Sequence, residues 1–193
     1  MCGIAGILHL DSAPVDAGLL PHMTDAIAHR GPDGEGQWAE GPVGLGHRRL
    51  AILDLSEAGR QPMSTPDGRY TITYNGEVYN FQELRRELEN LGYKFRSHTD
   101  TEVILHAFAE WREKALNRFN GMFAFAIWDK KRKELFLARD RYGIKPLYWA
   151  RRGNIFAFGS EIKAILAHPD FQAEIEPPPS RSAPRKSNFL PMR

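Results

Sequence analysis

The 193-residue sequence contains one cysteine and no long apolar run. A single cysteine excludes an internal disulfide framework, so a reducing cytoplasm is the expected compartment. A membrane-spanning helix needs about 20 consecutive apolar residues, and no stretch approaches that length. The first ten residues lack the basic segment of a secretion signal, and Asp11 and Ser12 follow them directly. The sequence therefore predicts a cytoplasmic protein with no membrane partner.

The sequence also lacks a strong excess of either charge. Its formal net charge is +2, from 26 lysines and arginines against 24 aspartates and glutamates. Four of the basic residues lie in segment 177–193, which contains no acidic residue. Without that segment the acidic residues outnumber the basic ones. The body of the chain therefore gives no reason to expect a nucleic-acid partner.

Motifs for metals and phosphates are missing as well. The seven histidines show no spacing typical of a metal site, and a lone histidine is usually structural. No glycine-rich phosphate loop with its lysine occurs. We therefore expect no metal site and no nucleotide-binding loop in this chain.

The one cysteine stands at position 2, directly after Met1. If Met1 is removed, which a small second residue permits, Cys2 carries both a thiol and a free α-amino group. The reference pKa of an α-amine is about 7.7–8.0, so a useful fraction is neutral near pH 7 and accepts the thiol proton. N-terminal threonine enzymes use the same arrangement. The alternative is that Cys2 serves only as a small buried apolar residue.

Apolar periodicity predicts strands that come in groups, separated by a few helices. Short β-rich runs are expected at 3–10, 37–39, 43–50, 69–74, 123–128, 134–138, 147–149 and 154–158. Amphipathic helices are expected at 16–29, 81–91, 101–111 and 161–167. Asn75-Gly76 has the signature of a turn after a strand. Grouped strands favour antiparallel sheets covered by helices over a doubly wound fold.

The composition changes at Glu176, where three consecutive prolines follow. The sequence therefore predicts one domain over residues 2–175. Residues 176–193 are expected to form an extended, disordered tail or the start of a linker.

Several short motifs occur in order along residues 2–170. They are CGI at 2–4, HRGPD at 29–33, HRRLAILD at 47–54, YNGEVYN at 74–80 and SHTDTE at 97–102. Together they resemble the glutaminase domain of class II glutamine amidotransferases, which belong to the N-terminal nucleophile hydrolases. Three further segments resemble the glutamine-hydrolysing asparagine synthetases in particular: FAFAIWD at 123–129, RDRYGIKPLY at 139–148 and FGSEIK at 158–163.

The resemblance implies a fold and a reaction. The fold is α+β, a four-layer α-β-β-α sandwich of antiparallel sheets. The reaction is hydrolysis of L-glutamine to glutamate and ammonia through a γ-glutamyl thioester on Cys2. In this scheme the Asn75 side chain and the Gly76 backbone N–H donate to the tetrahedral oxyanion. The alternative for this pair is an ordinary Asn-Gly turn.

The resemblance also assigns residues to substrate binding. Arg49 would hold the α-carboxylate of glutamine and Asp100 its α-ammonium group. A surface strand position for Arg49, or a helix start with a capping box at Thr99 and Glu102, would explain the same residues without a ligand.

Other positions would complete the pocket. Leu50, Ile52, Gly76 and Glu77 would line it, and Arg30 would assist from a loop over it. Arg48, beside Arg49, is expected to be solvated.

One part of the asparagine synthetases has no counterpart here. Those enzymes continue into a synthetase domain with a Ser-Gly-Gly-Leu-Asp-Ser-type loop that binds ATP and activates aspartate. The glutaminase reaction needs no cofactor, and ATP and Mg²⁺ would enter only with a synthetase domain or subunit as partner. We expect these residues alone to form no asparagine. Two other functions stay open: a silent or regulatory partner of a synthetase subunit, and the glutaminase half of another class II amidotransferase. A homo-oligomer also stays open.

Overall fold

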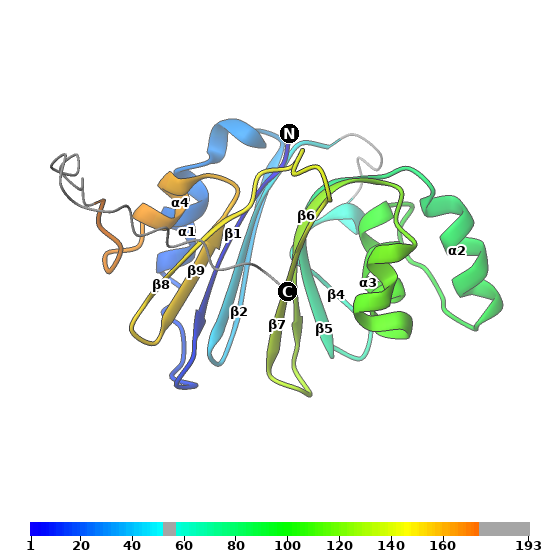
Figure 1. Cartoon of the computed structure of the whole chain (residues 1–193), viewed down its shortest axis with the longest axis horizontal. Helices are drawn as coiled ribbons and strands as arrows, with labels where there is room; N and C mark the ends of the chain where they lie inside the picture. Colours follow the sequence, from blue (N-terminus) through cyan, green and yellow to red (C-terminus); the bar gives the residue numbers. More distant parts are fainter. Residues whose placement is uncertain (52–56, 174–193) are drawn as a thin grey trace, which may run out of the picture.

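The computed structural model describes residues 1–51 and 57–173. They form two antiparallel sheets that face each other, and helices cover the outer face of each sheet (Figure 1). The layers run helices, sheet, sheet, helices, which confirms the predicted α-β-β-α sandwich. Two predictions lie outside the described residues: the pocket position of Ile52 and the tail at 176–193.

The first sheet has five strands in the order β2-β3-β1-β9-β8. Their bounds are β1 Gly3–His9, β2 Gly34–Glu40, β3 Val43–Arg49, β8 Tyr148–Arg152 and β9 Ile155–Gly159. Central strand β1 pairs with β3 in a register that sets Gly3 opposite Arg48. The start of β1 therefore lies beside the end of β3.

The second sheet has four strands in the order β4-β5-β6-β7. Their bounds are β4 Met63–Ser64, β5 Tyr70–Val78, β6 Gly121–Asp129 and β7 Glu134–Arg139. Strand β4 is two residues long and pairs with Thr71 and Ile72 near the start of β5. The later residues of β5 therefore extend past the end of β4.

Four α-helices of the described residues form the outer layers. Helices α1 (Leu19–Asp25) and α4 (Ile162–Leu166) pack on the first sheet, and α2 (Phe81–Asn90) and α3 (Asp100–Trp111) pack on the second. Short 3-10 helices occur at Ala28–Arg30, Glu57–Gly59 and Arg112–Asn117. No helix in the described ranges is long and apolar enough to cross a membrane.

Strand β6 explains how the two sheets pack. Its side chains alternate between two separate apolar clusters, as the period of two in a strand requires. Phe123, Phe125 and Ile127 pack towards α2 and α3, whereas Ala124 and Ala126 pack between the sheets. Because both faces of β6 are covered, its residues 123–128 form an uninterrupted apolar run.

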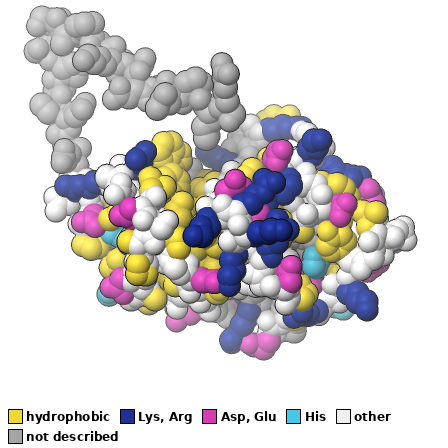
Figure 2. Space-filling view, turned by 90° about the horizontal axis from the view of Figure 1, so that it is seen from below, with side chains coloured by type: hydrophobic (Ala, Val, Ile, Leu, Met, Phe, Trp, Pro, Cys, Tyr) yellow, Lys and Arg dark blue, Asp and Glu magenta, His cyan; other side chains and the backbone are white. Residues whose placement is uncertain are grey.

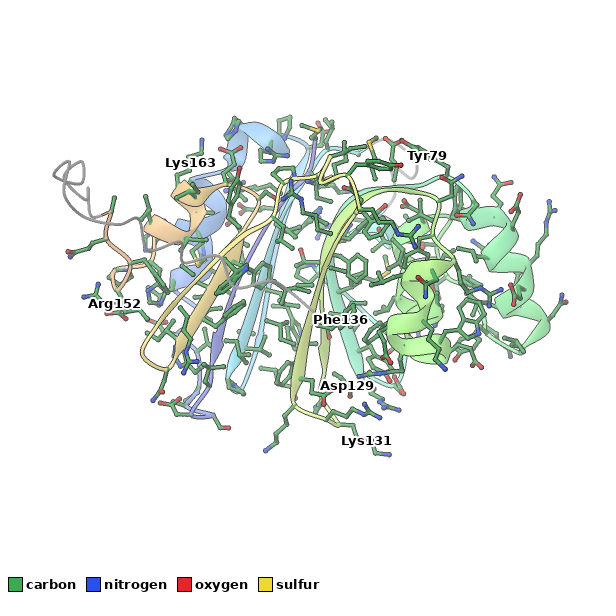
Figure 3. The ribbon with its side chains drawn as sticks, viewed as in Figure 1. Tyr79, Asp129, Lys131, Phe136, Arg152 and Lys163 are labelled. Atoms are coloured by element: carbon green, nitrogen blue, oxygen red, sulfur yellow. The ribbon has the colours of Figure 1, made fainter. Side chains whose placement is uncertain are left out.

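Asp129 lies at the end of the sandwich opposite the N-terminus (Figures 1 and 3). Its side chain is 1% exposed, and Arg112 and Arg69 hold it through ion pairs of 2.7 and 3.4 Å. Burial acts to raise the pKa of Asp129, but these arginines and the backbone N–H of Arg132 outweigh it and lower the pKa. Figure 2 views the molecule from this side, where many Lys and Arg side chains gather among acidic ones.

The predicted helix at 16–29 is wrong in its extent. The carboxylate of Asp16 accepts a hydrogen bond from the Gly18 N–H at 2.9 Å, so the chain turns before α1 begins. At the other end, Ile27 leaves helical geometry with φ −118° and ψ 21°, and a 3-10 turn follows. This break turns the chain so that Arg30 reaches the start of β1.

The turn predicted at Asn75-Gly76 is also wrong. Strand β5 continues to Val78, and Gly76 lies opposite Phe123 of β6. A Cβ atom added to Gly76 would lie 2.3 Å from the carbonyl oxygen of Met122. Glycine is needed here because β6 approaches closely, and pairing with β6 outweighs the local turn preference of the dipeptide.

Candidate functional site

A pocket opens where β1 begins and β3 ends, and its cavity volume is about 110 Å³. Seven of the predicted site residues line it: Cys2, Arg49, Leu50, Asn75, Gly76, Glu77 and Asp100. They come from both sheets and from the start of α3. The fold thus brings together residues that are about 100 positions apart in the sequence.

Cys2 immediately precedes β1, and its sulfur contacts the chain just beyond β3. The backbone N–H of Leu50 donates to Sγ at 3.3 Å, and Sγ lies 3.6 Å from the Leu50 carbonyl oxygen. Burial raises the pKa of the Cys2 thiol, while the Leu50 N–H and the positive charges of the N-terminus, Lys145 and Arg49 act in the opposite direction. The net shift is upward, so the thiol needs a base to become a nucleophile.

Arg30 supports the backbone of Cys2. Its Nε donates to the Cys2 carbonyl oxygen at 2.9 Å, and its Nη1 donates to Glu161 Oε1 at 3.0 Å. Burial acts to raise the pKa of Glu161, but hydrogen bonds from Arg30, Lys163 and His29 lower it. Arg30 lies on a 3-10 helix and is absent from the pocket lining, so the predicted loop over the pocket is wrong.

Asn75 brings an unsatisfied donor to the pocket. The residue is 1% exposed, and its Nδ2 atom is buried with no hydrogen-bond partner among the described residues. Leaving a buried amide donor unpaired costs about 1–3 kcal/mol. An acceptor bound in the pocket would remove that cost.

Gly76 brings a second donor, and the hydrogen bonds of its neighbours show where it points. On the same strand, Tyr74 N–H donates to Gln61 Oε1 at 2.6 Å and Val78 N–H donates to Asp100 Oδ2 at 3.0 Å. Both bonds leave β5 on the side away from β6. Since strand N–H directions repeat every second residue, the Gly76 N–H points to this side too.

The residue opposite Gly76 supports this assignment. Phe123 of β6 donates its N–H to the Asp140 carboxylate at 3.3 Å, and its carbonyl accepts the Asp140 N–H at 2.7 Å. Phe123 therefore directs its backbone groups away from β5. The Gly76 N–H is left facing the pocket side of the strand.

Asp100 is the first residue of α3 and is 4% exposed. Its Oδ2 accepts hydrogen bonds from the Tyr74 hydroxyl at 2.7 Å and from the Val78 N–H. Burial raises the pKa of Asp100, and these two hydrogen bonds oppose the rise without cancelling it. Burial and the neighbouring Asp100 carboxylate also raise the pKa of Tyr74 well above its ordinary value.

The capping box considered for this helix start is only half formed. Thr99 accepts the Glu102 N–H at 3.3 Å, as an N-cap residue does. The Glu102 carboxylate instead accepts the backbone N–H groups of Arg96 and Ser97. Asp100, the next residue after Thr99, lines the pocket.

The two arginines at the end of β3 lie on opposite faces of the sheet. Arg49 lines the pocket, whereas Arg48 pairs with Asp25 and, at 2.7 Å, with Glu35. The Arg48 side chain is 14% exposed, so the prediction that it is solvated is wrong. Neighbouring strand residues alternate between faces, and this alternation turns Arg48 towards α1.

A hydrogen bond at His47 joins the two sheets beside the pocket. Burial lowers the pKa of His47 to about 4, so the ring is neutral near pH 7. Its Nε2 lies 3.1 Å from the Tyr74 carbonyl oxygen and donates to it in this neutral form. Thr73 makes a similar link, with its hydroxyl donating to the Gly46 carbonyl at 3.0 Å. Both links stabilise the position of β5 relative to β3.

Sequence reasoning missed Lys145, Tyr74 and Gln61, which also line the pocket. Lys145 lies in the connection between β7 and β8 and is 5% exposed. A buried lysine is unusual, but nothing in the local sequence distinguishes it from a surface lysine. Within residues 1–51 and 57–173, no cluster of three or more His, Cys, Asp or Glu side chains could hold a metal ion.

Comparison with known proteins identifies the family of this chain. Residues 1–183 match the glutamine amidotransferase domain family. The chain is 50% identical over 179 residues to glutamine-hydrolyzing asparagine synthetase 3 of Bacillus subtilis, an alignment that covers 91% of this chain and 29% of that protein. It is 43% identical over 169 residues to synthetase 1 of the same organism, covering 86% and 27%. The chain thus spans less than a third of these two relatives.

The fold has solved relatives too. Glutamine phosphoribosylpyrophosphate amidotransferase from B. subtilis aligns with a TM-score of 0.73 at 23% identity, covering 86% of this chain and 43% of that one. At this identity the likeness shows the fold alone. The sequence match over residues 1–183 carries the family assignment. This chain belongs to the glutamine amidotransferase domain family and is homologous to part of the glutamine-hydrolysing asparagine synthetases.

Proposed function

We propose that this domain hydrolyses L-glutamine to glutamate and ammonia, with Cys2 as the nucleophile. One observation carries the proposal: two donors face the pocket of the one cysteine, and the Asn75 Nδ2 is buried there without a partner among the described residues. The other donor is the Gly76 N–H on the open side of β5. Such a pair fits a carbonyl oxygen that becomes negatively charged during reaction.

The first half of the reaction forms a thioester. Once Met1 is removed, the α-amine of Cys2 accepts the thiol proton and Sγ attacks the side-chain carbonyl carbon of glutamine. The carbonyl oxygen becomes an oxyanion and accepts hydrogen bonds from Asn75 and Gly76. The C–N bond then breaks, and the leaving nitrogen takes the proton from the α-ammonium group and departs as ammonia.

The second half releases glutamate. Water attacks the thioester carbonyl and transfers a proton to the α-amine as it attacks. The same two donors stabilise the new oxyanion. Cleavage of the C–S bond returns the proton to sulfur and restores Cys2. The raised pKa of the buried thiol supports the need for this attached base.

Substrate recognition is assigned to charges on the pocket wall. Arg49 would bind the α-carboxylate and Asp100 the α-ammonium group of glutamine. The Asp100 carboxylate is already oriented by Tyr74 and Val78, so little reorganisation is needed when a cation arrives. Leu50 and Glu77 would line the remaining surface.

The ammonia is assigned to an amide-forming partner. The sequence relatives are named asparagine synthetases, and this chain covers 29% of one and 27% of another. We infer that asparagine formation, with its ATP and Mg²⁺, belongs to a synthetase domain or subunit beyond these residues. The 50% identity to an asparagine synthetase favours this system over other amidotransferases.

The test is glutamate release by the chain after mass spectrometry has verified that it begins at Cys2. Diazo-oxo-norleucine, a glutamine analogue with a reactive carbon in place of the amide, should label Cys2 and stop turnover. Since the chain has one cysteine, the labelled peptide identifies the nucleophile. Absence of both glutamate and adduct in folded, correctly processed protein would favour the silent-partner alternative.

A further inference from the structure

Lys145 places a buried cation in the pocket of the nucleophile. The residue is 5% exposed and lines the same cavity as Cys2. In the part of the chain that the structure describes, its Nζ has one hydrogen-bond partner, the Met1 sulfur at 3.5 Å. No ion pair joins Nζ to a carboxylate of the described residues within 4.0 Å. Burying an ammonium group without a counter-ion costs folding free energy, which indicates a functional reason for its position.

The backbone of Lys145 is fixed by the loop that carries it. Its N–H donates to the Asp140 carboxylate at 3.0 Å, and its carbonyl accepts Arg139 Nε at 2.8 Å. The same carboxylate accepts the N–H groups of Tyr142 and Ile144. The loop is therefore wrapped around Asp140, and the backbone of Lys145 cannot move outward without breaking these hydrogen bonds.

Removal of Met1 changes the surroundings of this ammonium group. The thioether that Nζ contacts leaves with Met1, and the new α-amine of Cys2 is created at the same place in the chain. The charged and titratable side chains that face Cys2 from the packed elements are Arg30, His47, Arg49, Tyr74, Glu77, Asp100 and Lys145. His47 and Tyr74 are neutral near pH 7 because burial shifts their pKa values away from neutrality.

Substrate binding would neutralise two more of these charged side chains. If the proposed function is right, glutamine pairs its carboxylate with Arg49 and its ammonium group with Asp100. Arg30 is already paired with Glu161 and contacts the Cys2 carbonyl from outside the pocket. Lys145 and Glu77 are then the charged residues in the pocket lining that no substrate group neutralises, and Lys145 is among the charges that act on the Cys2 thiol.

A neighbouring cation acts on the amine and the thiol of Cys2 in the same direction. Fully protonated, the pair carries a charge of +1, as an ammonium and a neutral thiol. With one proton removed its net charge is zero, whichever group keeps the remaining proton. A buried positive charge therefore favours loss of that first proton. The singly protonated pair is the form that can attack glutamine.

We propose that Lys145 is a positioning residue that acts through Cys2, its ammonium group holding the amine–thiol pair in the singly protonated form near neutral pH. This inference rests on the proposed function, because it assumes that Met1 is removed and that Cys2 is the nucleophile. It assigns to Lys145 an electrostatic task and no contact with the reacting carbonyl.

The test is the pH dependence of Cys2 alkylation by iodoacetamide, measured without glutamine on protein verified to begin at Cys2. Because Cys2 is the one cysteine, the rate reports this sulfur alone. We expect Lys145→Met to move the midpoint upward by about 1 pH unit, and Lys145→Arg to retain the original midpoint. Lys131→Met is the matched control, since Lys131 lies at the end of the sandwich opposite the N-terminus (Figures 1 and 3).

The outcomes separate this inference from the proposed function. A shifted alkylation midpoint in a chain that never releases glutamate would support the role of Lys145 and refute glutamine hydrolysis. An unshifted midpoint in folded Lys145→Met would overturn the inference. So would a higher KM for glutamine with an unshifted profile, because Lys145 would then be a substrate contact.

A measurement on the unsubstituted chain covers the case in which Lys145→Met does not fold. A ¹³C NMR titration of the Cys2 Cβ atom gives the first midpoint of the pair directly. We expect it below about 7.7, the reference pKa of a free α-amine. A midpoint at or above this value would mean that the cation has no net effect, which overturns the inference.

Discussion

The Tyr74 hydroxyl donates a 2.7 Å hydrogen bond to the carboxylate of Asp100. Tyr74 belongs to β5 and Asp100 begins α3, so the bond joins the sheet to its covering helix at the pocket wall. Both residues are less than 5% exposed. The orientation of the carboxylate is therefore set by the protein before any ligand binds.

We expect Tyr74→Phe to raise the KM for glutamine by about 10-fold with little change in kcat. The substitution removes one hydrogen bond to a buried charged group, worth about 1.5 kcal/mol, and keeps the ring that packs against α3. Steady-state kinetics at saturating and limiting glutamine measure the two constants. A lower kcat at unchanged KM would contradict the assignment of Asp100 to the substrate's non-reacting end.

Activity should require a free amine on Cys2. We expect Cys2→Ala to abolish glutamate release, and retention of Met1 or an added N-terminal tag to lower it nearly as far. A tagged chain keeps the thiol, but its nitrogen is an amide that accepts no proton. The measurement is glutaminase activity on samples whose N-terminus is known from mass spectrometry. Full activity from chains that retain Met1 would refute the proton transfer proposed here.

The local sequence predicts much of the fold because each sheet is covered on both faces. The run at 123–128 is apolar throughout, and the structure makes it the central part of β6. Asn75-Gly76 is misread because a dipeptide preference is weaker than nine residues of pairing between β5 and β6. Lys145 carries no local signal, since its burial depends on the loop that closes around Asp140.

The local sequence also predicts much of the candidate site, because short motifs mark its residues. Seven of the site residues predicted from these motifs meet in one pocket. The supporting contacts are harder to foresee. Arg30 reaches Cys2 only because α1 ends early. The hydroxyl group that orients Asp100 comes from Tyr74, on strand β5.

Binding and chemistry should separate at two positions. Arg49→Ala should mainly raise KM, because losing one partner of a desolvated charge pair costs about 2–5 kcal/mol. Asn75→Ala should instead lower kcat by about 10²–10³ with little change in KM, because the oxyanion forms only after the ground state. Arg48→Ala is the control for Arg49, since Arg48 faces α1. Reversed effects on KM and kcat would mean that the two roles are exchanged.

Glu102 should make the stability depend on pH in acid. Burial acts to raise its pKa, but His106 at 3.7 Å and hydrogen bonds from Arg96 and Ser97 outweigh it and lower the pKa to about 2. A lowered pKa gives stability that is present above the unfolded value of about 4.3 and is lost as pH falls towards 2.

We therefore expect Glu102→Gln to remove about 2 kcal/mol of unfolding free energy at pH 7 and to flatten its decline between pH 4.5 and 2. Urea unfolding at a series of pH values measures both effects. Parallel stability curves for the variant and the parent chain would show that the carboxylate of Glu102 contributes nothing through its ionisation.

Gly76 should tolerate no side chain. An added Cβ would lie 2.3 Å from the Met122 carbonyl oxygen and 2.7 Å from the Phe123 Cα, and backbone atoms in a paired strand cannot yield easily. We expect Gly76→Ala to lower the unfolding free energy by about 1–3 kcal/mol, as overpacking does, and to move its N–H away from the oxyanion position. Gly34→Ala is the control, because its Cβ would meet Arg49 Cβ at an ordinary 3.9 Å. The melting temperature and kcat should therefore both fall for Gly76→Ala and stay unchanged for Gly34→Ala. Equal melting temperatures for the two variants would contradict the close approach of β6 to β5.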